Sequence, residues 1–221
     1  MINILEDYIS NSIPEWGEFS TNLNLTKKVN CTGTFLPYFG NTVVFDLSDE
    51  TKLALQVLQE ELYQSAGWML SQKVDPSTFH MTLHDLMNGP ELTEDLKIRM
   101  KEAEAKAKPV LEPWMRQQPI RMKSSWLFNM VNTSIVLGLI PADEDSWRRL
   151  DEMYMALEPV ATLGYALTPH ITIAYFKPGS YSQYDLNCLR KALHPIDLDV
   201  ELKLKNLVYQ EFMDMNHYES K

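Results

Sequence analysis

Apolar and polar side chains alternate along several short stretches of the chain, and this period of two predicts β-strands. The expected strands cover residues 42–47, 79–86, 121–130, 133–140, 170–176 and 198–212. Between them, apolar residues recur at the helical period, with Leu55, Leu58 and Leu62 on one face of the first such segment. The expected helices cover residues 49–67, 93–108, 143–158 and 185–193. This mixture of strands and helices predicts an α+β protein.

The order of strand, capped helix, loop and strand occurs twice along the chain. Each copy ends in a strand that carries a His-x-Thr sequence, and the two histidines, His80 and His170, lie 90 positions apart. Few residues are identical between the copies, so the repeat is one of pattern. We expect a duplicated, two-lobed α+β fold, in which antiparallel sheets flank a central cleft, helices lie outside and a pseudo-twofold axis relates the lobes. The expected organisation is an irregular N-terminal segment, residues 1–40, and a single bilobal domain, residues 41–221, with halves at 41–90 and 131–180.

The 221 residues include 20 basic and 30 acidic side chains, which gives a formal net charge of −10. Nucleic acids are held mainly by Lys and Arg on phosphates, so long RNA or DNA is a poor partner for this chain. No apolar run approaches the roughly 18 residues of a membrane span, and the N-terminus lacks a signal-peptide pattern. Two cysteines, Cys31 and Cys188, cannot form a disulfide framework. We therefore expect a cytoplasmic protein without a membrane partner.

The two His-x-Thr sequences, His80-Met81-Thr82-Leu83 and His170-Ile171-Thr172-Ile173, suit acid–base chemistry at phosphorus. Successive side chains of a strand point to opposite faces, so each histidine shares a face with its threonine above an apolar base. If both pairs reach one cleft, one neutral imidazole can take a proton from the attacking water or hydroxyl, while the other, protonated, gives one to the leaving oxygen. The unperturbed pKa of histidine, about 6.5, allows both forms near neutral pH. The threonine hydroxyls can hold the phosphate oxygens.

These motifs resemble the signature of the two-histidine (2H) phosphoesterases, which include 2′,5′ RNA ligase-like proteins and cyclic nucleotide phosphodiesterases. The resemblance covers residues from about 40 to 176. It implies a duplicated α+β fold with the motifs on facing strands, and metal-independent opening of a 2′,3′-cyclic phosphate or cleavage of a 2′–5′ phosphodiester. It assigns catalysis to His80 and His170, and phosphate binding to Thr82 and Thr172. The sequence has no metal-binding pattern such as HExxH, so we expect neither a metal nor another cofactor.

Several further residues are weaker candidates for substrate contact. His84 shares the predicted cleft face with His80 but is expected to be exposed near a strand end, and Tyr175 is expected on the face opposite to His170. The other candidates are a lysine beyond the second motif, two aromatic residues that could stack on a base, and an arginine on the third strand: Lys177, Tyr38, Trp126 and Arg121. The C-terminal segment around His217 is expected to be a frayed tail without a role.

The sequence leaves three interpretations open. The first is a phosphodiesterase acting on a small cyclic nucleotide or a short oligonucleotide. The second is a catalytically silent module that binds a nucleotide or phosphate on the same fold. The third is an unrelated α+β protein in which the motifs are accidental. Which histidine is the acid, which bond is cut and which base is preferred do not follow from the residues, and a monomer is the default for a self-contained cleft.

Overall fold

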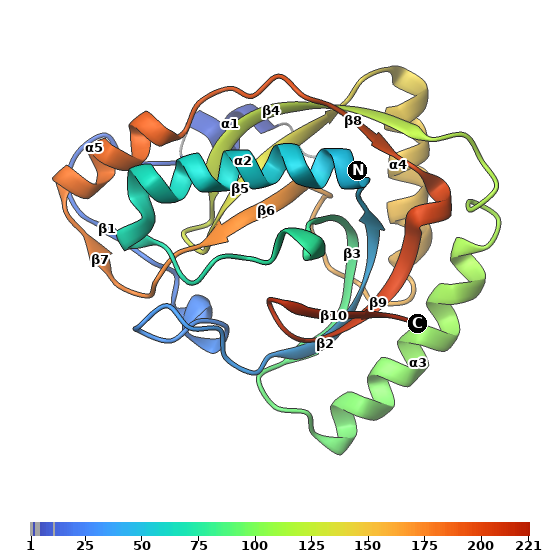
Figure 1. The fold of residues 1–221 in the computed structure, drawn as a ribbon. Helices are drawn as coiled ribbons and strands as arrows, with labels where there is room; N and C mark the ends of the chain where they lie inside the picture. Colours follow the sequence, from blue (N-terminus) through green and yellow to red (C-terminus); the bar gives the residue numbers. More distant parts are fainter. Residues whose placement is uncertain (1, 3–4, 11) are drawn as a thin grey trace.

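Eight strands form one curved antiparallel sheet through the middle of the molecule (Figure 1). The computed structural model describes residues 2, 5–10 and 12–221. From one edge of the sheet to the other, the strands are β10 (His217–Ser220), β9 (Leu207–Asp214), β2 (Phe39–Asp46), β3 (His80–Gly89), β6 (His170–Tyr175), β5 (Ser134–Pro141), β4 (Ile120–Met130) and β8 (Asp199–Leu202). The two strands with the His-x-Thr motifs are therefore the central neighbours.

The sheet divides into two lobes at its centre. We call strands β10, β9, β2 and β3 the first lobe, and strands β6, β5, β4 and β8 the second lobe. One residue pair, Met81 with Ile171, joins β3 to β6, whereas the other central neighbours share longer ladders. The predicted duplicated, two-lobed α+β fold is confirmed, with the two expected sheets continuous through this single pair.

The chain crosses between the lobes. Strand β4 follows the first motif in sequence but pairs with β5 of the second lobe. The long strand expected over residues 198–212 is interrupted by the short 3-10 helix η4 (Leu204–Asn206). The part before it, β8, pairs with β4, and the part after it, β9, pairs with β2. The first lobe therefore contains two strands, β9 and β10, that come from the C-terminal end of the sequence.

Of the four longer helices that the apolar periodicity predicts, α2 (Asp49–Ala66), α3 (Glu94–Leu111) and α4 (Glu144–Leu157) contact the eight-stranded sheet, and α5 (Gln183–Ala192) packs on α2. Helix α2 contacts β6, α3 contacts β3, β2 and β9, and α4 contacts β4, β5 and β3. Side-chain oxygens of Ser48 and Asp143 accept hydrogen bonds from backbone N–H groups in the first turns of α2 and α4, which confirms the expected caps. Helix α3 was expected to end at residue 108, but it continues through Pro109 to Leu111.

The N-terminal segment wraps the second lobe and closes its core. It contains α1 (Leu5–Ser10), β1 (Phe19–Ser20), which pairs with β7 (Ser180–Tyr181), and the 3-10 helix η1 (Leu23–Lys27). Buried side chains anchor it to the main core: Phe19, Leu25, Val29 and Phe35. Two further 3-10 helices, η2 (Gly67–Met69) and η3 (Pro76–Thr78), lie between α2 and β3. Within residues 2, 5–10 and 12–221, no helix is both long and apolar enough to cross a membrane.

Candidate active site

A cavity of about 480 Å³ opens where the two lobes meet, and both motifs line it. This volume is within the usual range for small-molecule sites, roughly 300–1,000 Å³. The side chains of His80, Thr82, His170 and Thr172 are half-buried in its wall. The intervening residues of both strands point the other way, into the apolar core under the helices. The strand alternation expected for each motif is therefore present in the structure.

The register of the central strands crosses the two motifs. Met81 lies opposite Ile171 in an antiparallel pair, so His80 comes opposite Thr172 and Thr82 opposite His170. Directly opposite side chains in such a pair are about 5 Å apart at Cβ, and diagonal neighbours about 7–8 Å. The two imidazoles are thus diagonal neighbours, each beside the threonine of the other strand. A single tetrahedral phosphate can fit between them.

The two imidazoles are held by matching hydrogen bonds. Nδ1 of His80 lies 2.7 Å from the carbonyl oxygen of Thr78, and Nδ1 of His170 lies 2.6 Å from the carbonyl oxygen of Thr168. A carbonyl oxygen can only accept, so each Nδ1 carries the proton and donates it. This leaves Nε2 of each ring as the nitrogen that can exchange a proton with a ligand. The edge of the His80 ring also packs on Tyr218, with ring centres 4.9 Å apart.

Burial sets the protonation of the pair. It lowers the pKa of both His80 and His170, because a charged imidazolium loses solvation inside the cavity wall. The backbone hydrogen bonds and the nearby carboxylate of Asp85 oppose this effect, and the charge of His170 lowers the pKa of His80 further. Both rings are consequently neutral at neutral pH when no ligand is bound. The first of them to take a proton makes it harder for the second to do so.

Each central strand contains a bulge at the same place in the repeat. The pairing of β2 with β3 skips Leu83, and the pairing of β5 with β6 skips Ile173, which lies 90 positions later. A bulge adds one residue to one strand and reverses the alternation beyond it. Asp85 and Tyr175, which follow the two bulges, therefore turn back to the cavity and line it. The prediction that Tyr175 lies on the opposite face from the catalytic pair was wrong for this reason.

The same bulge explains a second incorrect prediction. His84 was expected to lie exposed on the cleft face, but only 1% of its surface is exposed. Its Nδ1 donates to the carbonyl oxygen of Asp85 at 2.6 Å, and its Nε2 lies 3.3 Å from Oε1 of Glu158, just beyond α4. The ring also packs on Tyr154 of α4. The buried His84 ring thus forms part of the cavity wall, and its contacts connect β3 to the end of α4.

The sequence did not reveal most of the cavity lining, including Lys28, Asp85 and Tyr218. Lys28 comes from the N-terminal segment, with Nζ 4.9 Å from the ring centre of Tyr38. Burial lowers the pKa of Lys28, and the carboxylate of Asp85 opposes this shift.

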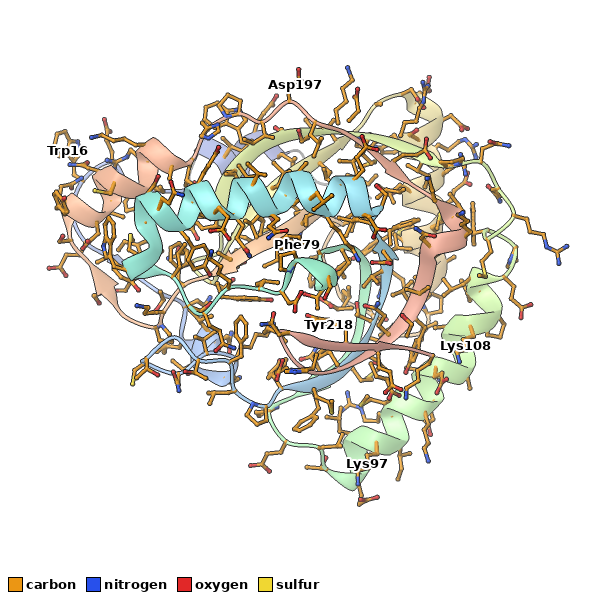
Figure 2. All side chains as sticks on the ribbon, viewed as in Figure 1. Trp16, Phe79, Lys97, Lys108, Asp197 and Tyr218 are labelled. Carbon is orange, nitrogen blue, oxygen red and sulfur yellow. The ribbon has the colours of Figure 1, made fainter. Side chains whose placement is uncertain are left out.

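Tyr218 belongs to β10, so the expectation of a frayed C-terminal tail was wrong. Tyr218 lies toward the middle of the molecule in Figure 2, whereas Trp16 lies at its far edge. Only Asp85 had a sequence signal, its place 90 positions before Tyr175.

Four of the weaker candidates do not line the cavity. Tyr38 is stacked on Phe212, a lining residue, and donates to Oδ1 of Asn88 at 2.6 Å. The three others lie farther along the strands or beyond them: Lys177 after β6, and Trp126 and Arg121 on β4. Strand β5 separates β4 from the central pair, and of β4 only its end at Met130 reaches the cavity. Arg121 forms an ion pair with Asp143 at 2.6 Å.

Among the residues that the structure describes, no three His, Cys, Asp or Glu side chains are placed to hold a metal ion.

Solved structures share this fold. No protein-family model and no curated protein matches the chain. A conserved protein of unknown function from Agrobacterium tumefaciens, ATU0111, is 16% identical, with 92% of this chain and 93% of that chain covered and a TM-score of 0.62. TT0787 of Thermus thermophilus is 16% identical, with 82% and 94% covered and a TM-score of 0.52. E. coli LigT in its apo form is 12% identical, with 83% and 94% covered and a TM-score of 0.49.

The likeness to the Agrobacterium and Thermus proteins extends over most of each chain and shows a common fold. In this chain the fold is duplicated and α+β, and the two motif strands are central neighbours that present both His-x-Thr pairs to one cavity. The duplicated α+β fold that the sequence predicts is thereby confirmed. The chemistry of the site is a separate question, which the geometry of the cavity addresses.

Proposed function

We propose that the chain is a metal-independent phosphodiesterase that opens the 2′,3′-cyclic phosphate, or cleaves the 2′–5′ phosphodiester, of a small nucleotide. The observation that supports this most is the crossed arrangement of the motifs. His80 lies opposite Thr172 and Thr82 opposite His170, so the two imidazoles are diagonal neighbours in the wall of one cavity. Paired imidazoles supply both proton transfers that in-line displacement at phosphorus requires.

In the proposed reaction, the phosphorus of the substrate lies between the two rings. Nε2 of one neutral imidazole takes a proton from the attacking water as its oxygen bonds to phosphorus. Nε2 of the other, protonated imidazole gives its proton to the leaving ribose oxygen as the P–O bond breaks. The hydroxyls of Thr82 and Thr172 donate hydrogen bonds to the non-bridging oxygens, whose charge grows in the transition state. The product leaves with the two protonation states exchanged, and proton exchange with water restores them.

The surroundings of the pair support a small substrate. The cavity of about 480 Å³ accommodates a nucleotide or dinucleotide rather than a duplex. Lys28 is the only Lys or Arg among the described residues that line it, so one cation complements the phosphate. The net charge of −10 disfavours longer nucleic acid. Tyrosines on several sides offer flat surfaces and hydroxyls to the sugar and base.

Turnover in EDTA tests the proposal. Purified protein is given a panel of 2′,3′-cyclic nucleoside monophosphates and a 2′–5′-linked dinucleotide, and the products are separated by chromatography. We expect hydrolysis of at least one substrate, and a loss of about 10²–10⁴-fold in kcat for both His80→Ala and His170→Ala. His194→Ala is the matched control, because His194 is exposed and lies outside the cavity.

Three outcomes would count against the proposal in different ways. Activity that survives in both histidine variants would place the chemistry elsewhere. Activity that EDTA abolishes would show that the reaction depends on a metal. Saturable binding of a nucleotide without turnover, lost in the same two variants, would favour the catalytically silent binding module instead.

A further inference from the structure

The cavity is nearly symmetric at the reacting centre but not beyond it. Past the bulges, β3 presents Asp85 and β6 presents Tyr175 at equivalent places of the repeat. Because the two strands run antiparallel, these residues diverge from the centre in opposite directions. One arm of the site, the part beyond the bulge of β3, therefore carries a carboxylate. The other arm, beyond the bulge of β6, carries a phenol, whose ring centre lies 5.7 Å from that of Phe35 in an edge-to-face contact.

The carboxylate of Asp85 stands out among its neighbours. It is the one acidic side chain among the described residues that line the cavity. Its Oδ1 lies 3.5 Å from the hydroxyl of Thr42, at the outer limit of a hydrogen bond, and that hydroxyl also donates to the carbonyl oxygen of His84 at 3.1 Å. A carboxylate has about four acceptor sites, so Asp85 retains capacity to accept hydrogen bonds from a ligand.

The charge of Asp85 restricts what can bind in its arm. A second phosphate there would be repelled, whereas N–H or O–H donors would be attracted. Leu163, Tyr165 and Leu167 also line the cavity and are suited to a planar ring. Burial raises the pKa of the Tyr165 phenol, and the carboxylate of Asp85 lies near enough to raise it further. A carboxylate with two oxygens in one plane matches a ring edge that carries two adjacent N–H donors. Of the common nucleobases, guanine alone has such an edge, formed by N1–H and the N2 amino group.

We propose that Asp85 recognises the guanine base of the substrate through its paired N–H donors, and thereby fixes one binding orientation in a site that is otherwise nearly symmetric. This inference rests on the proposed function and adds the base preference to it. Asp85 determines specificity and does not touch the reacting phosphorus. The pseudo-equivalent Tyr175 cannot replace it, because a phenol oxygen cannot accept two parallel N–H bonds as a carboxylate does.

The test compares substrates within each variant. The kcat/KM of the wild type is measured for the 2′,3′-cyclic phosphates of guanosine, inosine, adenosine and uridine. We expect guanosine to exceed adenosine and uridine by about 10–100-fold, and inosine, which lacks the N2 amino group, to fall between them. In Asp85→Asn the guanosine-to-adenosine ratio should fall to within about threefold of one, mainly through KM, since an amide offers one acceptor and one donor.

The ratio of two substrates separates recognition from general electrostatics, because a change in the protonation of the histidines affects both substrates alike. Asp46→Asn is the matched control. Asp46 also raises the pKa of His80, but it is paired with Lys52 at 2.7 Å and lies outside the cavity lining. Its removal should leave the guanosine-to-adenosine ratio unchanged. Asp85→Ala is a second variant in case the amide disturbs the fold, and circular dichroism checks both.

Every outcome of these measurements either supports or overturns the assignment of Asp85 to the guanine base. A wild type without guanosine preference, or an unchanged ratio in both Asp85 variants, overturns the inference while the proposed function stands. A uniform rise of KM for every base would assign Asp85 to a sugar hydroxyl and also overturn it. If the wild type turns over no substrate, calorimetric binding of guanosine 3′-monophosphate and uridine 3′-monophosphate replaces kinetics. Tighter guanosine binding that Asp85→Asn abolishes then supports the inference although the proposed function has failed.

Discussion

In the first half of the molecule, β3 presents His80, Thr82 and Asp85 to the cavity, and in the second half β6 presents His170, Thr172 and Tyr175 in the same order. The first two positions are identical in type, and the bulges that follow them coincide in the repeat. The carbonyl group that accepts from each Nδ1 also belongs to the residue two positions before the histidine in both halves. The third position differs.

The comparison separates two demands on the site. In-line displacement needs an acid and a base on two sides of phosphorus, and a twofold arrangement of equal groups meets this need. A nucleotide has different groups on the two sides of its phosphate. Different side chains in the two outer parts of the cavity can therefore bind it in one orientation. Under the proposed function, the halves agree where the phosphate would bind and the chemistry is symmetric, and they diverge farther out, where the substrate is not symmetric.

The threonines give the sharpest test of this symmetry. Thr82→Val and Thr172→Val each remove a hydroxyl while keeping the shape of the side chain, so one hydrogen bond to a charged phosphate oxygen is lost. Such a bond contributes about 1.5–3 kcal/mol, so we expect kcat/KM to fall by about 10–100-fold in each variant. Steady-state kinetics with the best substrate of the panel measure both. A large loss in one variant and none in the other would show that the phosphate lies in one half only.

A pH profile sharpens the comparison at the third position. Burial lowers the pKa of both His80 and His170 below the ordinary value of 6.5. The reactive form has one neutral and one protonated imidazole, so kcat/KM of the wild type should be bell-shaped with its maximum below pH 6.5. A bound phosphodiester anion favours the imidazolium, so the alkaline limb of kcat should lie at higher pH than that of kcat/KM.

Variants at the third position complete this prediction. Asp85 raises the pKa of both histidines, so Asp85→Asn should move the alkaline limb of kcat/KM to lower pH. Tyr175→Phe removes no charge at these pH values, because burial raises the pKa of Tyr175 above its ordinary value, and should leave the limb in place. An alkaline limb of kcat/KM above pH 7 in the wild type, or equal shifts of this limb in the two variants, would contradict the assignment.

Much of the centre of the site was predictable, because local patterns determine it. The period of two along each strand places His80 with Thr82 and His170 with Thr172, and the 90-residue offset predicts that the two pairs belong to one duplicated fold. The bulges were not predictable. A bulge depends on how a strand pairs with its neighbour, and the residues at the two bulges, Leu83 and Ile173, continue the apolar alternation.

The periphery of the site escaped prediction for a different reason. Lys28 and Tyr218 reach the cavity from segments near the two ends of the sequence, which lie outside the repeat. Their positions depend on the N-terminal wrap around the second lobe and on the pairing of β10 with β9. Contacts between distant segments leave no periodic signal in one sequence. The split of the expected 198–212 strand between two lobes has the same origin.

The hairpin between β4 and β5 is a feature of the second lobe, and its turn at the cavity edge is strained. Val131 has φ 44° and Asn132 has φ 61°, and the N–H of Thr133 closes the turn on the carbonyl oxygen of Met130 at 3.0 Å. Positive φ at both central residues is typical of a type I′ turn, which favours Asn and Gly and is unfavourable for a β-branched residue. Val131 nevertheless lines the cavity. Under the proposed function, this turn would present the apolar side chain of Val131, which is 56% exposed, to the substrate.

Val131→Asn should therefore increase stability and weaken substrate binding together. Asn adopts positive φ more readily than valine, so we expect the free energy of unfolding to rise by about 1 kcal/mol. KM should increase a few-fold, because the apolar contact is lost. Val131→Thr is the matched control, since threonine is also β-branched and keeps the strain. Urea unfolding and steady-state kinetics measure the two effects. Equal free energies of unfolding of the Asn and Thr variants would show that the turn is unstrained. The proposed link between backbone strain at Val131 and substrate binding would then be wrong.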